Sequence, residues 1–273
     1  MSTWFITGCS SGFGRVLAQT CIERGFNTVV TARRLCDIDD IAGENVLKLP
    51  LDVTDHDQVV AAVEAATERF TDIDVLVNNA GYCYRSPVEE GDRNAVEKMF
   101  AVNFYGVLDV IQQVMPQMRV RQSGTIVNIS SVAGRLAPPS SGFYAASKFA
   151  LEGISDALRV ETEGFGIRVI LIEPGAFRTN FNYRAFAESV VETDVYADSV
   201  GKRRKEVINM CGKEPGDPTK AAEAIIAVAT AKNPPFRLPL GESAYSRIRA
   251  LLATQTAELD AWESIGRHTD YQE

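Results

Sequence analysis

The chain is poor in the residues that zinc sites, disulfide frameworks and histidine-based catalytic triads require. It has two histidines, His56 and His268, and five cysteines that form no Cys-x-x-Cys pair. An odd number of irregularly spaced cysteines is typical of reduced thiols in a cytosolic protein rather than of disulfide bonds. We therefore expect no metal site and no serine–histidine–aspartate triad.

Long apolar runs and clustered basic charge are also missing. No segment approaches the roughly 20 continuous apolar residues that a membrane-spanning helix needs, and the first residues do not resemble a signal peptide. The formal net charge is −8, from 28 Lys and Arg against 36 Asp and Glu, whereas nucleic-acid binding needs clustered cations. We expect a cytoplasmic protein with neither a membrane nor a nucleic-acid partner.

Short β-branched runs alternate with longer amphipathic stretches, which is typical of a parallel sheet with crossover helices. A chain of 273 residues, 45% of them hydrophobic, fits one α/β domain over residues 1–273. The predicted fold is a Rossmann-type, doubly wound, seven-stranded parallel sheet flanked by helices. The expected strands are Thr3–Thr7, Thr28–Ala32, Val46–Asp52, Val75–Asn78, Thr125–Ser130, Ile167–Glu173 and Phe236–Leu240.

The stretches between these runs repeat apolar residues at helical spacing. Gly25 ends the first predicted helix, and an acidic residue begins the second. The third and fourth carry more apolar positions than one sheet face should cover, so we expect a homodimer or homotetramer. The predicted helices are Gly12–Arg24, Asp55–Phe70, Asn94–Met118, Phe143–Thr162 and a C-terminal one over residues 242–265.

Residues 176–216 break the alternation, because they show no strand pattern and mix aromatic with charged residues. Segments of this length without secondary structure are commonly lids or binding elements. We expect a mobile substrate lid, with an ordinary packed helical insertion as the alternative. The aromatic residues expected to close over an apolar substrate are Phe177, Phe181, Tyr183, Phe186 and Tyr196.

A glycine-rich turn joins the first predicted strand to the first helix. Glycines at its three points permit a tight turn, close approach of a diphosphate and close helix–strand packing. The helix N-terminus adds free N–H groups for the phosphates. The spacing Gly-x-x-x-Gly-x-Gly differs from the usual Gly-x-Gly-x-x-Gly fingerprint. The evidence for a coenzyme site is therefore the position of the turn between the first strand and the first helix. The expected coenzyme-binding residues here are Gly8, Ser10, Ser11, Gly12, Phe13 and Gly14.

The end of the second predicted strand indicates the coenzyme. Enzymes that use NAD usually place an acidic residue there to bind the ribose 2′-hydroxyl, but this chain has Ala32 followed by Arg33 and Arg34. Guanidinium groups suit a 2′-phosphate. We therefore predict NADP as the coenzyme, with both arginines as ligands; the alternative is that they are solvated residues at a strand end.

Tyr144 and Lys148 lie four residues apart in a predicted helix and so share one face. An ammonium group beside a phenol favours the phenolate, and we expect Lys148 to lower the pKa of Tyr144 toward the working pH. Ser131 follows the fifth predicted strand, where it is placed to donate a hydrogen bond to a substrate oxygen. An isolated Tyr-x-x-x-Lys pair is common on surface helices, so this motif needs its context.

That context resembles the short-chain dehydrogenase/reductase family over essentially the whole chain. Each matching motif is weak to moderate alone, but their order and spacing are highly specific. The family's spacing to the tyrosine selects Ser131 over Ser130. The matching pieces are Thr7-Gly8-x-x-x-Gly12-x-Gly14, Asp52-Val53, Asn78-Asn79-Ala80-Gly81, Asn103, Ser131, Tyr144-x-x-x-Lys148 and Pro174-Gly175 leading to Thr179.

The resemblance implies a hydride-transferring oxidoreductase that interconverts a ketone or aldehyde and an alcohol. Tyr144 would be the proton donor in reduction and Ser131 its partner at the substrate oxygen. Lys148 would also hold the nicotinamide ribose, and Asn103 would support a water that links Lys148 to solvent.

The resemblance also assigns coenzyme contacts. Asp52 and Val53 would contact the adenine, and Asn79, Ala80 and Gly81 the adenosine side. Arg33 matches NADP-preferring members. Pro174, Gly175, Phe177 and Thr179 would lie at the carboxamide.

Residues 216–220, 234–241 and the tail resemble a subgroup similar to 17β-hydroxysteroid and retinol dehydrogenases. Two other functions remain open. A catalytically weak NADP-binding sensor or scaffold would keep the fold without turnover, and the intact Ser131, Tyr144 and Lys148 argue against it. An epimerase or dehydratase acting on a nucleotide-sugar is disfavoured by the three-residue gap between Gly8 and Gly12 and by the modest chain length.

Overall fold

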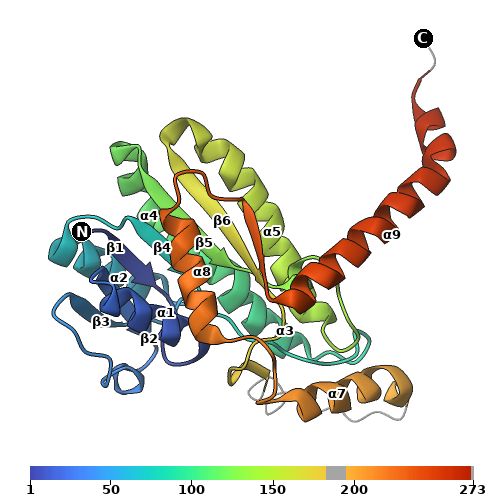
Figure 1. Cartoon of the computed structure of the whole chain (residues 1–273), viewed down its shortest axis with the longest axis horizontal. Helices are drawn as coiled ribbons and strands as arrows, with labels where there is room; N and C mark the ends of the chain where they lie inside the picture. The colour runs from blue at the N-terminus through green and yellow to red at the C-terminus, as the bar shows by residue number, and fades with distance from the viewer. Residues whose placement is uncertain (183–194, 272–273) are drawn as a thin grey trace.

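Seven parallel strands form one sheet in the order β3-β2-β1-β4-β5-β6-β7 in the computed structural model (Figure 1). The structure describes residues 1–182 and 195–271. The chain adds β2 and β3 on one side of β1 and then β4 to β7 on the other side, which makes the sheet doubly wound. The predicted fold class is confirmed. The strands are β1 (Thr3–Ile6), β2 (Asn27–Ala32), β3 (Val46–Pro50), β4 (Val75–Asn78), β5 (Gly124–Ile129), β6 (Ile167–Pro174) and β7 (Arg237–Leu240).

The strand boundaries differ from the predicted ones by no more than two residues. Thr7, Asp52 and Ser130 were expected to be the last residues of strands, but they lie in the loops that follow β1, β3 and β5. Ligands in open parallel sheets bind beyond the carboxyl ends of strands. The shift therefore moves these polar side chains to the edge of the sheet where a ligand would lie.

Helices cover both faces of the sheet (Figure 1). One face packs on α1 (Gly12–Glu23) and α8 (Pro218–Thr230), which lie beside each other. The opposite face packs on α2 (His56–Phe70), α4 (Gly106–Arg121) and α5 (Gly142–Thr162). Successive residues of a strand point to opposite faces, and burial on both sides explains why the strands are almost continuously apolar.

The long helix expected over Asn94–Met118 is wrong as a single α-helix. The chain instead forms α3 (Arg93–Phe100), a π-helical turn over Ala101–Tyr105 and then α4. A π-helical turn accommodates one extra residue and is frequent at functional sites. Beyond it, α4 begins close to the loop after β3, where a Cβ on Gly106 would lie 2.6 Å from the carbonyl oxygen of Val53.

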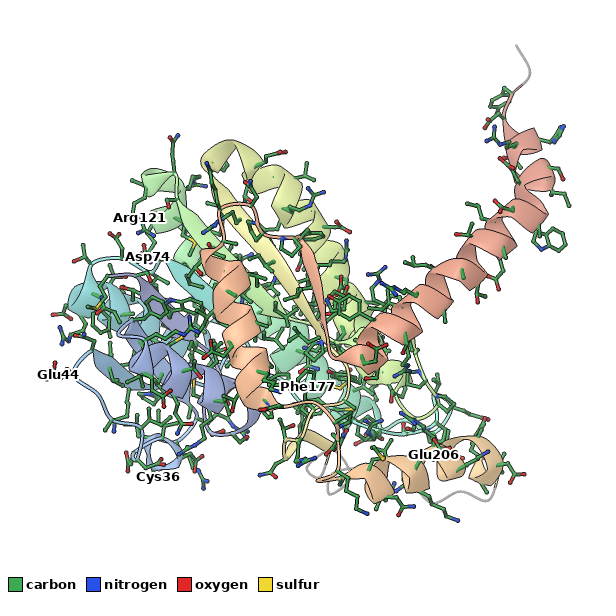
Figure 2. All side chains as sticks on the ribbon, in the orientation of Figure 1. Cys36, Glu44, Asp74, Arg121, Phe177 and Glu206 are labelled. Carbon is green, nitrogen blue, oxygen red and sulfur yellow. The ribbon has the colours of Figure 1, made fainter. Side chains whose placement is uncertain are left out.

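Residues 176–216 leave the carboxyl edge of the sheet and return to it. Phe177 pairs with Gly216 through an isolated parallel bridge, and α7 (Lys202–Met210) lies between them, preceded by a π-helical turn over Ala197–Gly201. Figure 2 shows Phe177 near the sheet and Glu206 on α7, farther from it. Tyr183 and Phe186 lie outside the described residues.

Near the C-terminal end of the described residues, α9 (Glu242–Gly266) extends away from the rest of the molecule and is followed by a 3₁₀ turn over Arg267–Thr269 (Figure 1). Only its first turns reach the body, where Ala244 and Ile248 are buried. Within residues 1–182 and 195–271, no helix combines the length and the apolar character that crossing a bilayer demands.

Candidate active site

A cavity of about 970 Å³ follows the carboxyl edge of the sheet and is open to solvent. It extends past the ends of β1 and β4, where the strand order reverses and α/β sheets bind ligands. All but three of the predicted site residues line it; the exceptions are Gly14, Arg34 and Asn103. The predicted residues at its wall are Gly8, Ser10, Ser11, Gly12, Phe13, Arg33, Asp52, Val53, Asn79, Ala80, Gly81, Ser131, Tyr144, Lys148, Pro174, Gly175, Phe177 and Thr179.

In the glycine turn after β1, the backbone conformation and the close packing leave no room for a side chain at several positions. Gly8 and Gly12 have φ of +73° and +61°, a region that favours glycine. A Cβ on Gly8 would also lie 2.9 Å from the Cα atom of Ala80. Gly14 has another purpose, because a Cβ there would lie 2.4 Å from the Nδ2 atom of Asn79. Gly14 thus permits packing behind the turn and does not reach the cavity.

The N-terminus of α1 faces the cavity without a side-chain cap. Its N-cap residue Ser11 accepts no hydrogen bond from the helix, and the first turn carries no acidic residue. By contrast, α2, α3 and α8 are capped by the carboxylates of Asp55, Asp92 and Asp217. The first N–H groups of α1 are therefore left for an external anion, and the helix dipole favours one. A dinucleotide diphosphate fits this cradle.

Thr7 and Asn79 tie the ends of β1 and β4 together. The Thr7 hydroxyl oxygen accepts hydrogen bonds from the backbone N–H groups of Asn79 and Ala80, both at 3.0 Å. The Asn79 amide donates to the carbonyl oxygens of Thr7 and Gly8, at 2.8 and 3.0 Å. These bonds fix the two loops that flank the switch point, so the floor of the cavity is rigid on this side.

The two arginines after β2 differ in position. Arg33 is exposed and lines the cavity beside the buried Ala32. Arg34 instead holds Asp37 with two hydrogen bonds, of 2.7 and 3.1 Å, outside the cavity wall. Of the pair, only Arg33 is placed to meet a phosphate in the cavity, because Arg34 is engaged by a carboxylate three residues away.

Tyr144 and Lys148 lie one turn apart on α5 and both are buried. The hydroxyl groups of Tyr144 and Ser131 are hydrogen-bonded. Ser131 is also the N-cap of a short 3₁₀ turn, where its oxygen accepts a hydrogen bond from the Ala133 N–H at 3.0 Å. Ser130 makes no comparable contact with the tyrosine. The structure therefore brings together the serine, tyrosine and lysine that the sequence singled out.

The expected effect of Lys148 on Tyr144 is wrong in this structure. Burial raises the pKa of Tyr144, and the hydrogen bond from Ser131 and the charge of Arg85 offset only part of that rise. The Lys148 Nζ atom lies 5.9 Å from the centre of the tyrosine ring and donates to the carbonyl oxygen of Ile129 at 2.8 Å. Loss of water therefore sets the direction of the shift, and the charge of Lys148 is not among its causes.

Burial also acts on Lys148 itself. Desolvation of the ammonium group lowers its pKa to about 8, although the carboxylate of Glu152, one turn further along α5, acts in the opposite direction. Glu152 in turn pairs with Arg237 at 2.9 Å. Arg237 also approaches Glu173 at 3.6 Å. Glu152 therefore helps to keep the lysine charged and is itself held by Arg237.

Asn103 lies behind the cavity wall, in the π-helical turn, and is fully buried. Its amide both accepts from the N–H of Tyr82 at 3.0 Å and donates to the carbonyl oxygen of that residue at 2.9 Å. A Cβ on Gly81 would lie 3.1 Å from the Asn103 oxygen and 3.6 Å from the Lys148 nitrogen. The extra residue of the π turn thus brings Asn103 close to Lys148, with Gly81 between them.

Several residues of the cavity wall were not found from the sequence. Arg85 follows β4 and donates to the Ser141 hydroxyl at 2.7 Å and to the side-chain amide oxygen of Asn182 at 3.0 Å. Such residues belong to no recognisable motif, because only the folding of α7 and α9 over the sheet edge brings them together. Others in this group are Arg203, Val207, Met210, Glu214, Ser243 and Arg247. Among the described residues, no group of His, Cys, Asp and Glu side chains is suited to a metal ion.

Comparison with known proteins gives consistent matches. The short chain dehydrogenase family matches residues 2–189. A 3-ketodihydrosphingosine reductase from Bacteroides thetaiotaomicron is 38% identical over 240 residues, covering 86% of both chains. A short-chain dehydrogenase from Streptomyces avermitilis superposes with a TM-score of 0.90 at 36% identity, covering 99% of this chain and 98% of that one.

Two further solved structures contain coenzymes. A closed form of serine dehydrogenase complexed with NADP⁺ is 26% identical, with a TM-score of 0.76 over 87% of this chain and 94% of that one. A short chain dehydrogenase/reductase from Burkholderia phymatum in complex with NAD is also 26% identical, with a TM-score of 0.80 over 95% of both chains. Similar folds thus hold either dinucleotide.

Replacing Lys148 with methionine is expected to stabilise the protein without coenzyme. The pKa of Lys148 falls from 10.5 to about 8 on folding, so the cost of burying its charge is fully present below pH 8. That cost disappears as the pH rises toward 10.5. At pH 7, Lys148→Met should raise the free energy of unfolding by up to about 3 kcal/mol, measured by urea denaturation.

The gain should shrink to nothing near pH 10.5. Lys98→Met is the matched control, because Lys98 also lines the cavity but is exposed, and its stability should not change. A less stable Lys148→Met protein at pH 7 would contradict the reasoning.

Proposed function

Because the chain belongs to the short chain dehydrogenase family, we propose that it is an NADP(H)-dependent oxidoreductase that interconverts a ketone or aldehyde and an alcohol. One observation carries the proposal. The Tyr144 hydroxyl is hydrogen-bonded to Ser131 and lies one helical turn from Lys148, at the wall of the cavity that the uncapped end of α1 also faces. A proton donor and a dinucleotide cradle thus share one space.

Each catalytic residue has a separate role in the reduction. Tyr144 gives its proton to the substrate oxygen, and its raised pKa keeps that proton in place until a negative charge develops on the oxygen. Ser131 donates a second hydrogen bond to the same oxygen. Lys148 holds the nicotinamide ribose, and Asn103 supports a water path from Lys148 to solvent. When bound, the nicotinamide supplies or accepts the hydride.

Successive groups of residues along the cavity wall bind successive parts of the coenzyme. Asp52 and Val53 contact the adenine, and Asn79 to Gly81 the adenosine side. The turn from Gly8 to Phe13 and the end of α1 hold the diphosphate. Pro174 to Thr179 lie at the carboxamide. Arg33 meets the 2′-phosphate, which distinguishes NADP from NAD.

The catalytically weak sensor or scaffold is the less favoured function, because its fold would need no assembled proton donor. Ser131, Tyr144 and Lys148 are all present, in contact or one turn apart, and open to the cavity. Nothing in the described residues favours a nucleotide-sugar epimerase or dehydratase.

The substrate end of the cavity supports an apolar carbonyl compound, as in the 17β-hydroxysteroid and retinol dehydrogenase-like subgroup. Phe181 packs against Tyr144 with ring centres 5.7 Å apart, and Val207 and Met210 of α7 line the same cavity. A relative named for reduction of 3-ketodihydrosphingosine also acts on a ketone. We place the enzyme in the cytoplasm.

The proposed lid over residues 176–216 uses its aromatic residues in different ways. Phe181 covers Tyr144, whereas Phe177 packs edge-on against Phe13 at 5.1 Å beside the coenzyme cradle. The Tyr196 hydroxyl donates to a carboxylate oxygen of Glu89 and so points elsewhere. Of these three, Phe181 alone is placed to contact both a substrate and the catalytic tyrosine.

The proposed homodimer or homotetramer is supported by exposed apolar side chains on α4 and α5 and the turn before α4. Tyr105, Phe149 and Val160 are 63%, 47% and 60% exposed. A contiguous patch of such groups marks a surface that is covered in an assembly, and we propose that these groups form one. In the family that the sequence resembles, these two helices form a four-helix interface.

Tyr144→Phe should abolish carbonyl reduction and leave coenzyme binding nearly intact. Removing a general acid costs about a hundredfold or more in rate, while the contacts that hold the coenzyme are mostly elsewhere in the cavity. NADPH oxidation across a panel of ketones and aldehydes measures the first effect, and fluorescence titration with NADPH the second. Lys148→Ala should impair both. More than a few per cent residual turnover in Tyr144→Phe would require another proton donor.

NADP(H) should be preferred over NAD(H) by more than tenfold in kcat/KM. A charge-assisted hydrogen bond to the 2′-phosphate contributes about 1.5–3 kcal/mol. Arg33→Asp should reverse the preference, because the new carboxylate repels the phosphate and binds the 2′-hydroxyl. Arg34→Ala is the control, since Arg34 pairs with Asp37 outside the cavity, and it should keep the preference. Equal efficiency with both coenzymes would refute this assignment.

Phe181→Ala should raise the KM for bulky apolar ketones several-fold and leave the KM for NADPH unchanged. The phenyl ring supplies apolar surface over the substrate, and a buried phenylalanine contributes about 1.5–3 kcal/mol. Phe165→Ala serves as the control, because Phe165 is exposed and does not line the cavity. Equal changes for ketone and coenzyme would place Phe181 outside the substrate site.

A further inference from the structure

The distal part of α9 has no neighbour among the described residues. Ala244 and Ile248 are its only buried residues, and from Leu252 to Tyr271 every residue is exposed. Figures 1 and 2 show this part standing clear of the sheet and its covering helices, with its side chains surrounded by solvent. A single helix is only marginally stable in water without tertiary packing, so a helix of this length calls for a partner.

One side of α9 carries an apolar row. Tyr245, Ile248, Leu252, Gln255, Leu259 and Trp262 follow one another at spacings of three and four residues, which places them on one face; we name this row the α9 stripe. Leu252 is 47% exposed, Leu259 72% and Trp262 66%. The body covers the stripe only at Ile248, so the same face that docks α9 on its own chain continues uncovered beyond it.

The charges of α9 are separated along its length. Arg247 and Arg249 lie in the first half, after Glu242 at its start, and Glu258, Asp260 and Glu263 lie in the second. Glu263 also pairs with Arg267, just beyond the end of the helix, at 2.7 Å. Arg249 and Glu263 lie fourteen residues apart, which is close to four helical turns, so they flank the stripe on the same side. Two copies aligned in opposite directions bring the positive half of each helix beside the negative half of the other. Parallel copies place like charges together.

We propose that the α9 stripe is a self-association surface that packs antiparallel on the α9 stripe of a second copy of this chain. A two-fold axis near Thr256 and Ala257 places Leu252 opposite Trp262 and Gln255 opposite Leu259. The same register puts Arg249 beside Glu263 of the second copy, and symmetry repeats this pair once.

This surface is separate from the exposed apolar groups on α4 and α5, and it does not depend on the proposed enzymatic activity. A two-fold contact uses each α9 once. Together with a dimer formed through α4 and α5, it would complete a tetramer.

Sedimentation velocity of the full chain at micromolar concentration tests the proposal. Leu259→Glu with Trp262→Glu places two charges in the stripe and should halve the assembly, from tetramer to dimer or from dimer to monomer. Ala253→Glu with Ala257→Glu is the matched control, because it adds the same charges to the opposite side of the same helix and should leave the mass unchanged. Phe149→Glu reports separately on α5.

All these positions except Phe149 lie on a solvated helix, so the body should keep its fold, which near-ultraviolet circular dichroism checks. Equal masses for the wild type, the stripe variant and the control would overturn the proposal. The α9 stripe would then be a surface for a membrane or for a different protein. A mass that falls equally in the stripe variant and the control would also overturn it.

A charge exchange tests the direction. Arg249→Glu and Glu263→Arg should each weaken association at least tenfold, because each creates like-charge pairs across the axis. The double variant should recover wild-type association, since every Arg249–Glu263 pair is restored in reverse. Failure of this rescue would overturn the antiparallel arrangement even if the stripe variant dissociates.

Discussion

The hydrogen bonds between Thr7 and Asn79 are the constraint on which the site depends. They join the loops after β1 and β4 at the point where the strand order reverses. Because these bonds occupy both side chains and four backbone groups, neither loop is free to move independently. The glycine turn, the uncapped end of α1 and the stretch from Asn79 to Gly81 are therefore presented to the cavity in one fixed arrangement.

Desolvation then decides the protonation of the catalytic groups. Tyr144 and Lys148 both lose water on burial, which disfavours the charged form of each. The result is a phenol that keeps its proton and a lysine whose charge is supported by Glu152. This combination suits the delivery of a proton to a developing oxyanion. It also carries a cost, because the buried ammonium group lowers the stability of the fold.

Three differences from the sequence-based expectations share one origin. The helix over Asn94–Met118 is interrupted by a π turn, Arg34 is held by Asp37 outside the cavity, and Lys148 does not lower the pKa of Tyr144. Each expectation treated a local pattern as sufficient. For Arg34 and for Tyr144, the outcome is set by something that the pattern does not include: a neighbouring carboxylate in the first case and the removal of water in the second.

Local chemistry was sufficient to predict the sheet and the coenzyme turn, and the resemblance to the family added further residues of the cavity wall. Strand periodicity and glycine positions depend on near neighbours, and parallel strands necessarily bring their carboxyl ends to one edge. The position of Asn103 behind Gly81, the arrival of Arg85 and α7 at the substrate end, and the exposure of the α9 stripe required the tertiary structure. These features depend on contacts between distant segments and on which surfaces remain uncovered, and neither is encoded in the spacing of residues along the chain.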